Sequence, residues 1–183
     1  MLDQLIEVLI QGKDYEILCF EIIIVKRMIH NYESFSRRNN FGDIETINSI
    51  PEFALKFLFG EKLDIGKLLL VREALLELAP DSEMYPGVDS TYALDTCAAC
   101  DSLLSYLIDN DKESISRCSK LAMETVYISI ADTYNIEEDD IIGEHTLMIN
   151  EINFQIALIR KIISVKDMDD IITIANGIYN DIP

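Results

Sequence analysis

The segment from Ile17 to Val25 constrains the fold of this chain more than any other, because it is apolar on nearly every side of a helix. A helix that is apolar all round has to be covered on all its faces by other elements. The sequence therefore predicts a central apolar helix over residues 14–29. The whole chain has only 7 Gly and 4 Pro, which leaves little material for the tight turns of an all-β fold.

Apolar positions at helical spacing predict further helices along the chain. Asp43, Asp64 and Asp167 each precede such a stripe and are predicted N-caps. Pro51 predicts a break or kink near residues 49–50. The expected helices, beside the central one, cover residues 2–10, 44–59, 65–78, 91–108, 114–135, 144–165 and 167–178, with a short helical turn at 31–35.

This pattern gives about eight helices and no convincing strand. A segment rich in Pro, Gly or Ser that could separate two domains is not visible. The fold class is therefore predicted to be all-α, a multi-helix bundle that forms a single domain over residues 1–183.

The charge of the chain is strongly one-sided. Its 33 acidic and 15 basic residues give a net charge of −18 at pH 7. Such a surface repels the phosphates of nucleic acids and of anionic membranes, so the sequence predicts neither direct nucleic-acid binding nor membrane binding. The charge favours a basic protein partner, or it serves only to keep the protein soluble.

The N-terminal residues and the cysteines indicate a cytoplasmic protein. Met1 to Glu7 lack a basic region and contain Asp3 and Glu7, which is not the pattern of a signal peptide. The most apolar run, residues 22–25, is far shorter than the roughly 20 residues that span a bilayer. Four cysteines among apolar neighbours are then expected to be reduced and buried.

Motifs for catalysis or for metal binding are weak. Cys97 and Cys100 have zinc-like spacing, but a second pair is missing and packing in the core is the better interpretation. Residues 109–113 resemble the start of a calcium loop, but the Gly at the sixth position of such a loop and the Glu ligand at the twelfth are missing. The chain has two histidines, His30 and His145, and no Gly-x-Ser-x-Gly or phosphate-binding loop. We therefore predict no enzyme activity, no metal and no cofactor.

Acidic residues form two clusters that fall near predicted helix ends. Clusters of one charge are either solvated surface or a docking site for a Lys- and Arg-rich protein. We take them as candidate partner-binding residues. The first cluster is Asp132, Glu137, Glu138, Asp139, Asp140 and Glu144, and the second is Asp167, Asp169 and Asp170.

Two stretches resemble a known bacterial family. Lys26-Arg27-Met28-Ile29-His30-Asn31-Tyr32-Glu33-Ser34-Phe35 leads to Asn40-Phe41-Gly42-Asp43, and Tyr92 to Ala99 follows later. They are similar to the "E-R-M-x-P-N-Y-x-x-F", "G-F-G-D" and "A-x-D-A" patterns of the YjaG-like family of unknown function, number 416 in that series. His30 replaces the usual Pro and Asn40 the usual Gly, which indicates a diverged member. The resemblance implies an all-α fold and little about function.

Five polar residues match positions of that family: Arg27, Asn31, Tyr32, Asp43 and Asp95. We expect them to be structural. Asn31 and Asp43 are predicted helix caps. Asp95 is predicted to be a buried acid whose partner is Arg27 or Tyr32, with Arg27–Asp95 as the candidate buried ion pair.

The charge, the clusters and the missing catalytic groups lead to a functional hypothesis. A diverged and very acidic helical protein resembles an immunity protein, which would neutralise a basic nuclease toxin of a contact-dependent or similar interbacterial system by occluding its RNA-binding active site. The alternative is a cytoplasmic housekeeping or regulatory protein without a toxin partner. An enzyme would instead need a pocket lined by Asp95, Arg27, Tyr32 and Tyr92.

Overall fold

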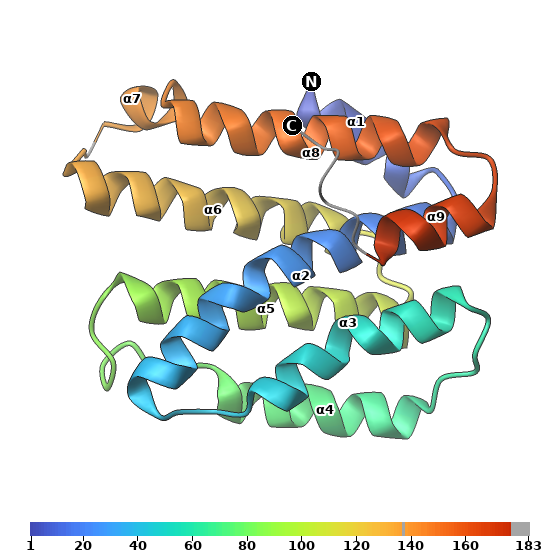
Figure 1. Cartoon of the computed structure of the whole chain (residues 1–183), viewed down its shortest axis with the longest axis horizontal. Helices are drawn as coiled ribbons and strands as arrows, with labels where there is room; N and C mark the ends of the chain where they lie inside the picture. The colour runs from blue at the N-terminus through green and yellow to red at the C-terminus, as the bar shows by residue number, and fades with distance from the viewer. Residues whose placement is uncertain (137, 177–183) are drawn as a thin grey trace.

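Helix α2 (Asp14–Asn39) is the element around which the other helices pack (Figure 1). The computed structural model describes residues 1–136 and 138–176, except for the side chain of Asp140. Within these ranges the chain forms nine helices and no strand. The others are α1 (Leu2–Ile10), α3 (Ile44–Leu58), α4 (Ile65–Leu78), α5 (Val88–Asp109), α6 (Ser114–Tyr134), α7 (Asp139–Gly143), α8 (Thr146–Ser164) and α9 (Met168–Ala175).

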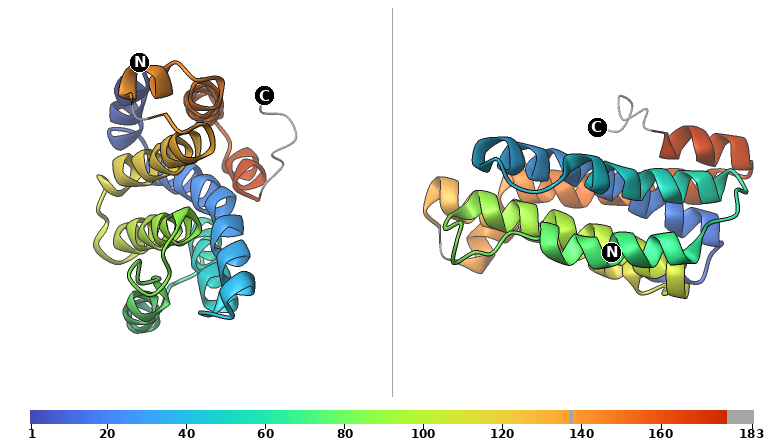
Figure 2. Two further views of the ribbon diagram at one scale, coloured as in Figure 1. Left: turned by 90° about the vertical axis from the view of Figure 1, so that its left-hand side faces the viewer. Right: turned by 90° about the horizontal axis from the view of Figure 1, so that it is seen from below.

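The helices form a flattened stack with α2 running through its middle. In Figure 1, α1, α7 and α8 lie at the top and α4 at the bottom, and the end-on view of Figure 2 shows the same order. Helix α2 contacts α3, α5, α6, α8 and α9. Every residue from Glu16 to Val25 is buried, so the predicted central helix and the all-α class are confirmed. None of the described helices is long and apolar enough to cross a membrane.

The central helix is longer than expected, because it does not end near Ile29. Met28, Ile29, Tyr32 and Phe35 continue its buried face down to Asn39. Apolar burial over this face outweighs any tendency of Asn31 to end a helix. The predicted capping role of Asn31 is therefore wrong. The helix ends at Asn39, and its C-cap residue Asn40 takes the left-handed conformation with φ 48°.

Three predicted caps are confirmed. Asp43, Asp64 and Asp167 each accept hydrogen bonds from backbone N–H groups in the first turn of the next helix. The hydrogen bonds to Asp43, from the Thr46 side chain first, lower the pKa of its carboxyl group. The break that the sequence predicts as one possibility near residues 49–50 does not occur, since α3 continues from Ile44 to Leu58 through Pro51. Pro51 lacks the backbone N–H of a normal helix residue, and its ring clashes with the preceding turn of the helix. Burial of Ile47, Ile50 and Ala54, which are fully buried in the same helix, offsets this cost.

The four cysteines are free and buried in the bundle, as predicted for packing residues. Burial raises the pKa of the Cys19 and Cys97 thiols to about 12. At neutral pH these groups are thiols and behave as small apolar side chains.

Gly42 joins α2 to α3 and lies against Tyr32. Its φ is +77°, a conformation that L-residues adopt with strain, and an added Cβ would meet the Tyr32 hydroxyl group. That hydroxyl is fixed by donating a hydrogen bond of 3.0 Å to the Leu78 carbonyl. The turn thus connects α2, α3 and the end of α4 at one point.

Replacing Gly42 with Ala should lower the free energy of unfolding by about 2 kcal/mol or more, from backbone strain and the clash together. Urea denaturation measures the loss. Gly60→Ala is the matched control, because Gly60 has φ +80° but nothing within 4 Å of an added Cβ, so strain alone should cost about 1 kcal/mol. Equal losses in the two variants would show that the Tyr32 contact contributes nothing.

Candidate functional site

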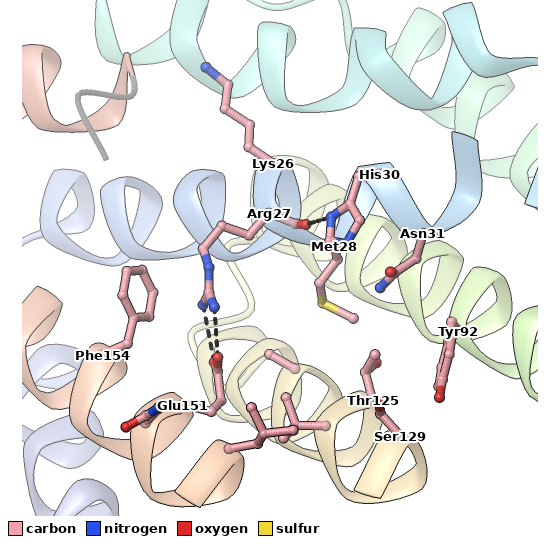
Figure 3. Close-up of a pocket in the computed structure, with 14 residues that line it drawn as sticks. Lys26, Arg27, Met28, His30, Asn31, Tyr92, Thr125, Ser129, Glu151 and Phe154 are labelled. Atoms are coloured by element: carbon pink, nitrogen blue, oxygen red, sulfur yellow. Dashed lines mark hydrogen bonds and ion pairs between the residues drawn. The ribbon is translucent and has the colours of Figure 1, made fainter. Parts of the chain in front are cut away.

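A pocket of about 770 Å³ opens between α2, α5, α6 and α8 (Figure 3). Its size is that of a small-molecule site, and its walls are mixed. Apolar side chains make up one part of the lining: Met28, Ala122, Val126, Leu147 and Phe154. Polar side chains make up the rest: Lys26, Arg27, His30, Asn31, Tyr92, Thr125, Ser129, Asn150 and Glu151.

An ion pair closes one side of this pocket. Arg27 Nη1 and Nη2 donate to Glu151 Oε1 and Oε2 at 3.1 and 2.7 Å. The guanidinium also lies over the Phe154 ring, 3.8 Å from its centroid. The Glu151 side chain is 4% exposed and that of Arg27 is 33% exposed. The pair is therefore largely withdrawn from water, in the bidentate geometry that suits Arg.

The ion pair continues into the core through two further side chains. Gln155 Nε2 donates to Glu151 Oε1 at 2.9 Å, and the Ser119 hydroxyl donates to Gln155 Oε1. Gln155 and Ser119 are both fully buried. A buried carboxylate with this many donors is satisfied within the protein, so the network fixes α2 against α8 and α6.

Asp95 lies beside the pocket but does not pair with Arg27, so the predicted ion pair is wrong. Its carboxylate accepts a hydrogen bond of 2.9 Å from the Thr125 hydroxyl, and Thr125 lines the pocket. Arg27 faces α8, whereas Asp95 on α5 faces α6. Burial raises the pKa of Asp95 to about 6; the Thr125 hydrogen bond opposes the rise, and the charge of Glu124 adds to it.

Sequence reasoning missed Glu151, although a signal was present. Met148, Glu151, Gln155, Leu158 and Ile162 are all buried on one face of α8. Two polar residues inside a buried helical stripe indicate a buried polar network. Which helix supplies their partners is set by the packing of the bundle, and periodicity does not contain this information.

The other predicted structural residues are spread over the bundle. Asn31 lines the pocket from within α2, and Tyr92 lines it from α5. Tyr32 lies away from the pocket, against Gly42 and Leu78, and Asp43 caps α3. Of the four residues expected to line an enzyme pocket, Arg27 and Tyr92 do so. Asp95 is not in the lining but is hydrogen-bonded to Thr125, which is.

The first acidic cluster lies at one end of the bundle, where α6 ends, α7 forms and α8 begins (Figure 1). Asp132, Glu138, Asp139 and Glu144 are exposed there. Glu137 lies outside the described residues, and Asp140 belongs to α7. The Tyr127 hydroxyl donates to Asp139, which holds α7 against α6.

The second acidic cluster is remote from the first. Asp167, Asp169 and Asp170 are exposed at the start of α9, beyond the other end of α8. Helix α8 has 19 residues, which corresponds to about 28 Å. Asp167 also serves as a cap, accepting from Asp169 N at 3.0 Å. The two clusters therefore cannot act as one continuous small patch.

A family model described as "Protein of unknown function (DUF416)" matches residues 11–180. The crystal structure of a DUF416 family protein from Shewanella baltica OS155 has a TM-score of 0.84 and 21% identity, with 96% of this chain and 93% of that chain covered. At this identity the likeness shows the fold alone. None of the curated proteins matches the chain.

Proposed function

Because this chain belongs to the DUF416 family, whose function is unknown, we propose a function from its own surface: it is a non-catalytic binding protein that docks a basic protein. The docking surface is the acidic end of the bundle. We define the acidic end by eight exposed side chains, Asp132, Tyr134, Glu138, Asp139, Ile141, Glu144, Leu147 and Ile149.

The observation that carries this proposal is the mixture of apolar and acidic groups at the acidic end. Tyr134, Ile141, Leu147 and Ile149 are 44–53% exposed among the carboxylates. Protein interfaces combine apolar and aromatic contacts at the centre with a polar rim. The chain has no Lys or Arg between Lys120 and Arg160. A basic partner is thus attracted by charge and retained by apolar contact.

The acidic end has its own small core, which presents these groups in a fixed arrangement. Ile130 of α6, Ile142 of α7 and Met148 of α8 are buried together, apart from the main core. The Tyr134 ring also packs against His145 at 4.7 Å between centroids. A preorganised surface loses less conformational entropy on binding.

This proposal gives the charged groups of the pocket a structural role. Arg27 and Glu151 satisfy each other's charges, and His30 Nδ1 faces the Arg27 carbonyl. In its narrower form, the proposal is that this is a cytoplasmic immunity protein and that its partner is a nuclease toxin whose basic, RNA-binding groove is plugged by the acidic end. The alternative is a housekeeping or regulatory role with another basic partner.

Reversing charge at the acidic end should slow association strongly. In the variant Asp132→Lys/Glu144→Lys we expect the on-rate for the co-purified partner to fall at least about 10-fold at low salt, since steering by charge sets this rate. Affinity capture from lysate at low and high salt isolates the partner, and mass spectrometry identifies it. Surface plasmon resonance then measures the on-rate. Asp169→Lys/Asp170→Lys is the charge-matched control at the second cluster and should retain most binding.

Two results would contradict the proposal: association that does not change with salt, or equal binding by the two variants. The narrower form has a separate genetic test. If the partner is a toxin encoded beside this protein, deletion of the gene is lethal only while the neighbouring gene is intact. A viable deletion with an active neighbour leaves the basic-partner proposal in place and excludes the toxin.

A further inference from the structure

The pocket between α2, α5, α6 and α8 has two ends of different chemistry (Figure 3). The ion pair of Arg27 and Glu151 closes one end. At the other end, side chains from α2, α5 and α6 are polar but uncharged. We call this group the neutral end of the pocket, and it consists of Asn31, Tyr92 and Ser129. A ligand in the pocket would therefore meet an ion pair on one side and neutral hydrogen-bonding groups on the other.

The neutral end holds hydrogen-bonding groups that the protein itself does not use. Among the described residues, no backbone or side-chain group bonds to the Asn31 amide or to the hydroxyl groups of Tyr92 and Ser129. Thr125 lies beside them and differs, since its hydroxyl group donates to Asp95. All three side chains of the neutral end are partly buried. Polar groups withdrawn from bulk water are normally satisfied by a partner, so the neutral end is suited to a ligand that supplies one.

The charged groups of the pocket are already engaged, which argues against a charged ligand. Arg27 and Glu151 form a bidentate pair, so neither is a free counter-charge. Lys26 points away from this pair in Figure 3, and its ammonium group donates to the Ala175 carbonyl at 3.4 Å. The His30 Nδ1 atom faces the Arg27 carbonyl. Since a charged ligand would lose its hydration here without gaining a free counter-charge, the pocket suits an uncharged molecule.

Apolar side chains form the wall between the two ends. Met28 lies between the ion pair and the neutral end in Figure 3, and Ala122, Val126 and Leu147 belong to the same lining. The Met thioether makes favourable contacts with aromatic rings. The volume of about 770 Å³ is that of a site which encloses one small molecule. The wall thus favours an aromatic ring as the body of the ligand.

We propose that this pocket binds an uncharged heteroaromatic molecule with the chemistry of a nucleoside. Its ring lies against Met28 and Val126. The Asn31 amide offers a donor and an acceptor side by side, and these pair with a base edge that has the complementary groups, as Asn does with adenine. The hydroxyl groups of Tyr92 and Ser129 bind those of the sugar.

Ligand binding in the pocket is a second function beside the proposed docking at the acidic end. Of the residues that define the acidic end, only Leu147 also lines the pocket. The affinity for an uncharged ligand should change less than about 2-fold between low and high salt, because no charge pair is screened. Partner docking should depend strongly on salt. Failure of one proposal therefore does not affect the other.

Isothermal titration calorimetry of the full chain with adenosine, guanosine, cytidine and uridine tests the proposed ligand. At least one of these nucleosides should bind as one molecule per chain, with a Kd below about 1 mM. The 5′-monophosphate of the same nucleoside should bind more weakly, because its phosphate meets no free cation. If none of the four nucleosides binds, or if the monophosphate binds as tightly as the nucleoside or more tightly, the proposed ligand chemistry is wrong.

Substitutions at the neutral end test the location of the site. Asn31→Leu keeps the approximate size of the side chain but removes its hydrogen-bonding groups, and it should weaken nucleoside binding at least about 10-fold. Because Asn31 makes no hydrogen bond within the described part of the chain, the fold should be retained, which circular dichroism checks. Asn153→Leu is the matched control, since Asn153 is an exposed residue of α8 outside the pocket lining, and it should bind normally.

Tyr92→Phe is a second variant that removes a single hydroxyl group and leaves the ring in place. It should weaken nucleoside binding at least about 3-fold, and it keeps the test valid if Asn31→Leu unfolds the protein. Wild-type affinity in Tyr92→Phe and in a folded Asn31→Leu variant would overturn the proposed site.

Discussion

The protein should lose stability as the pH rises from about 5 to 8, because Glu21 is buried without a partner for its charge. Glu21 in α2 is fully buried, and neither of its carboxyl oxygens has a hydrogen-bond partner among the described residues. Burial raises the pKa of Glu21 from 4.5 to about 8; the nearby Ser114 hydroxyl and the Arg117 charge oppose this rise without cancelling it. In the native protein the group is therefore a neutral acid at neutral pH.

The direction of the pH effect follows from proton binding. Between pH 4.5 and 8 the native state holds a proton on Glu21 that the unfolded chain has released. The stability that this group contributes is complete below pH 4.5 and is lost as the pH rises to 8. Each pKa unit corresponds to about 1.4 kcal/mol, so the loss amounts to several kcal/mol.

Glu21→Gln isolates this effect, because its side chain is uncharged at every pH. Urea denaturation at pH 5, 6, 7 and 8 should show a variant that is close to wild type at pH 5 and clearly more stable at pH 8. Glu7→Gln is the control for net charge, since Glu7 is exposed. If the stability difference between Glu21→Gln and wild type were the same at pH 5 and pH 8, Glu21 would be charged in the native state.

Removal of Arg27 should destabilise the protein by about 3 kcal/mol, since it leaves the charge of Glu151 buried and unpaired. The Glu151 side chain is 4% exposed, and Gln155 is the only other side chain that donates to it in the described part of the chain. Arg27→Met keeps the length and the contact with Phe154 but removes the charge. The free energy of unfolding in urea at pH 7 measures the loss.

Two comparisons separate charge from packing. Arg37→Met removes an exposed ion pair, Arg37–Glu33 at 3.4 Å, and should cost at most about 0.5 kcal/mol. The double variant Arg27→Met/Glu151→Met should be more stable than Arg27→Met alone, because no unpaired charge remains. A loss in Arg27→Met that merely equals the loss in Arg37→Met would contradict a buried ion pair.

Much of the fold could be predicted from the sequence, because helix caps and apolar stripes depend on residues that are close together in the chain. Asp43, Asp64 and Asp167 were predicted as caps because a short acceptor before an apolar stripe has one local function, and all three cap helices. The segment 17–25 is apolar on nearly every side of a helix, so it had to be covered by other helices at the centre of the bundle. The resemblance to family 416 rested on the residues around Arg27 and on Asp95, and the family match confirms it.

The contacts of the candidate site could not be predicted as well from the sequence, because they depend on which faces of the helices pack against one another. Arg27 and Asp95 were paired in the prediction as the most plausible buried opposite charges. The bundle instead turns Arg27 toward Glu151 and Asp95 toward Thr125. By contrast, the separation of the two acidic clusters could be predicted, because the expected helix over residues 144–165 lies between them and α8 has 19 residues.

The central position of α2 has a consequence for synthesis of the chain on the ribosome. Helix α2 ends at Asn39, but α8 and α9, which cover part of it, begin only at Thr146 and Met168. At 5–20 residues per second, roughly 5 to 20 s pass between the emergence of α2 and that of α8. During this time the nascent chain carries an apolar helix without its full cover, and transiently exposed apolar surface of this kind is prone to aggregate.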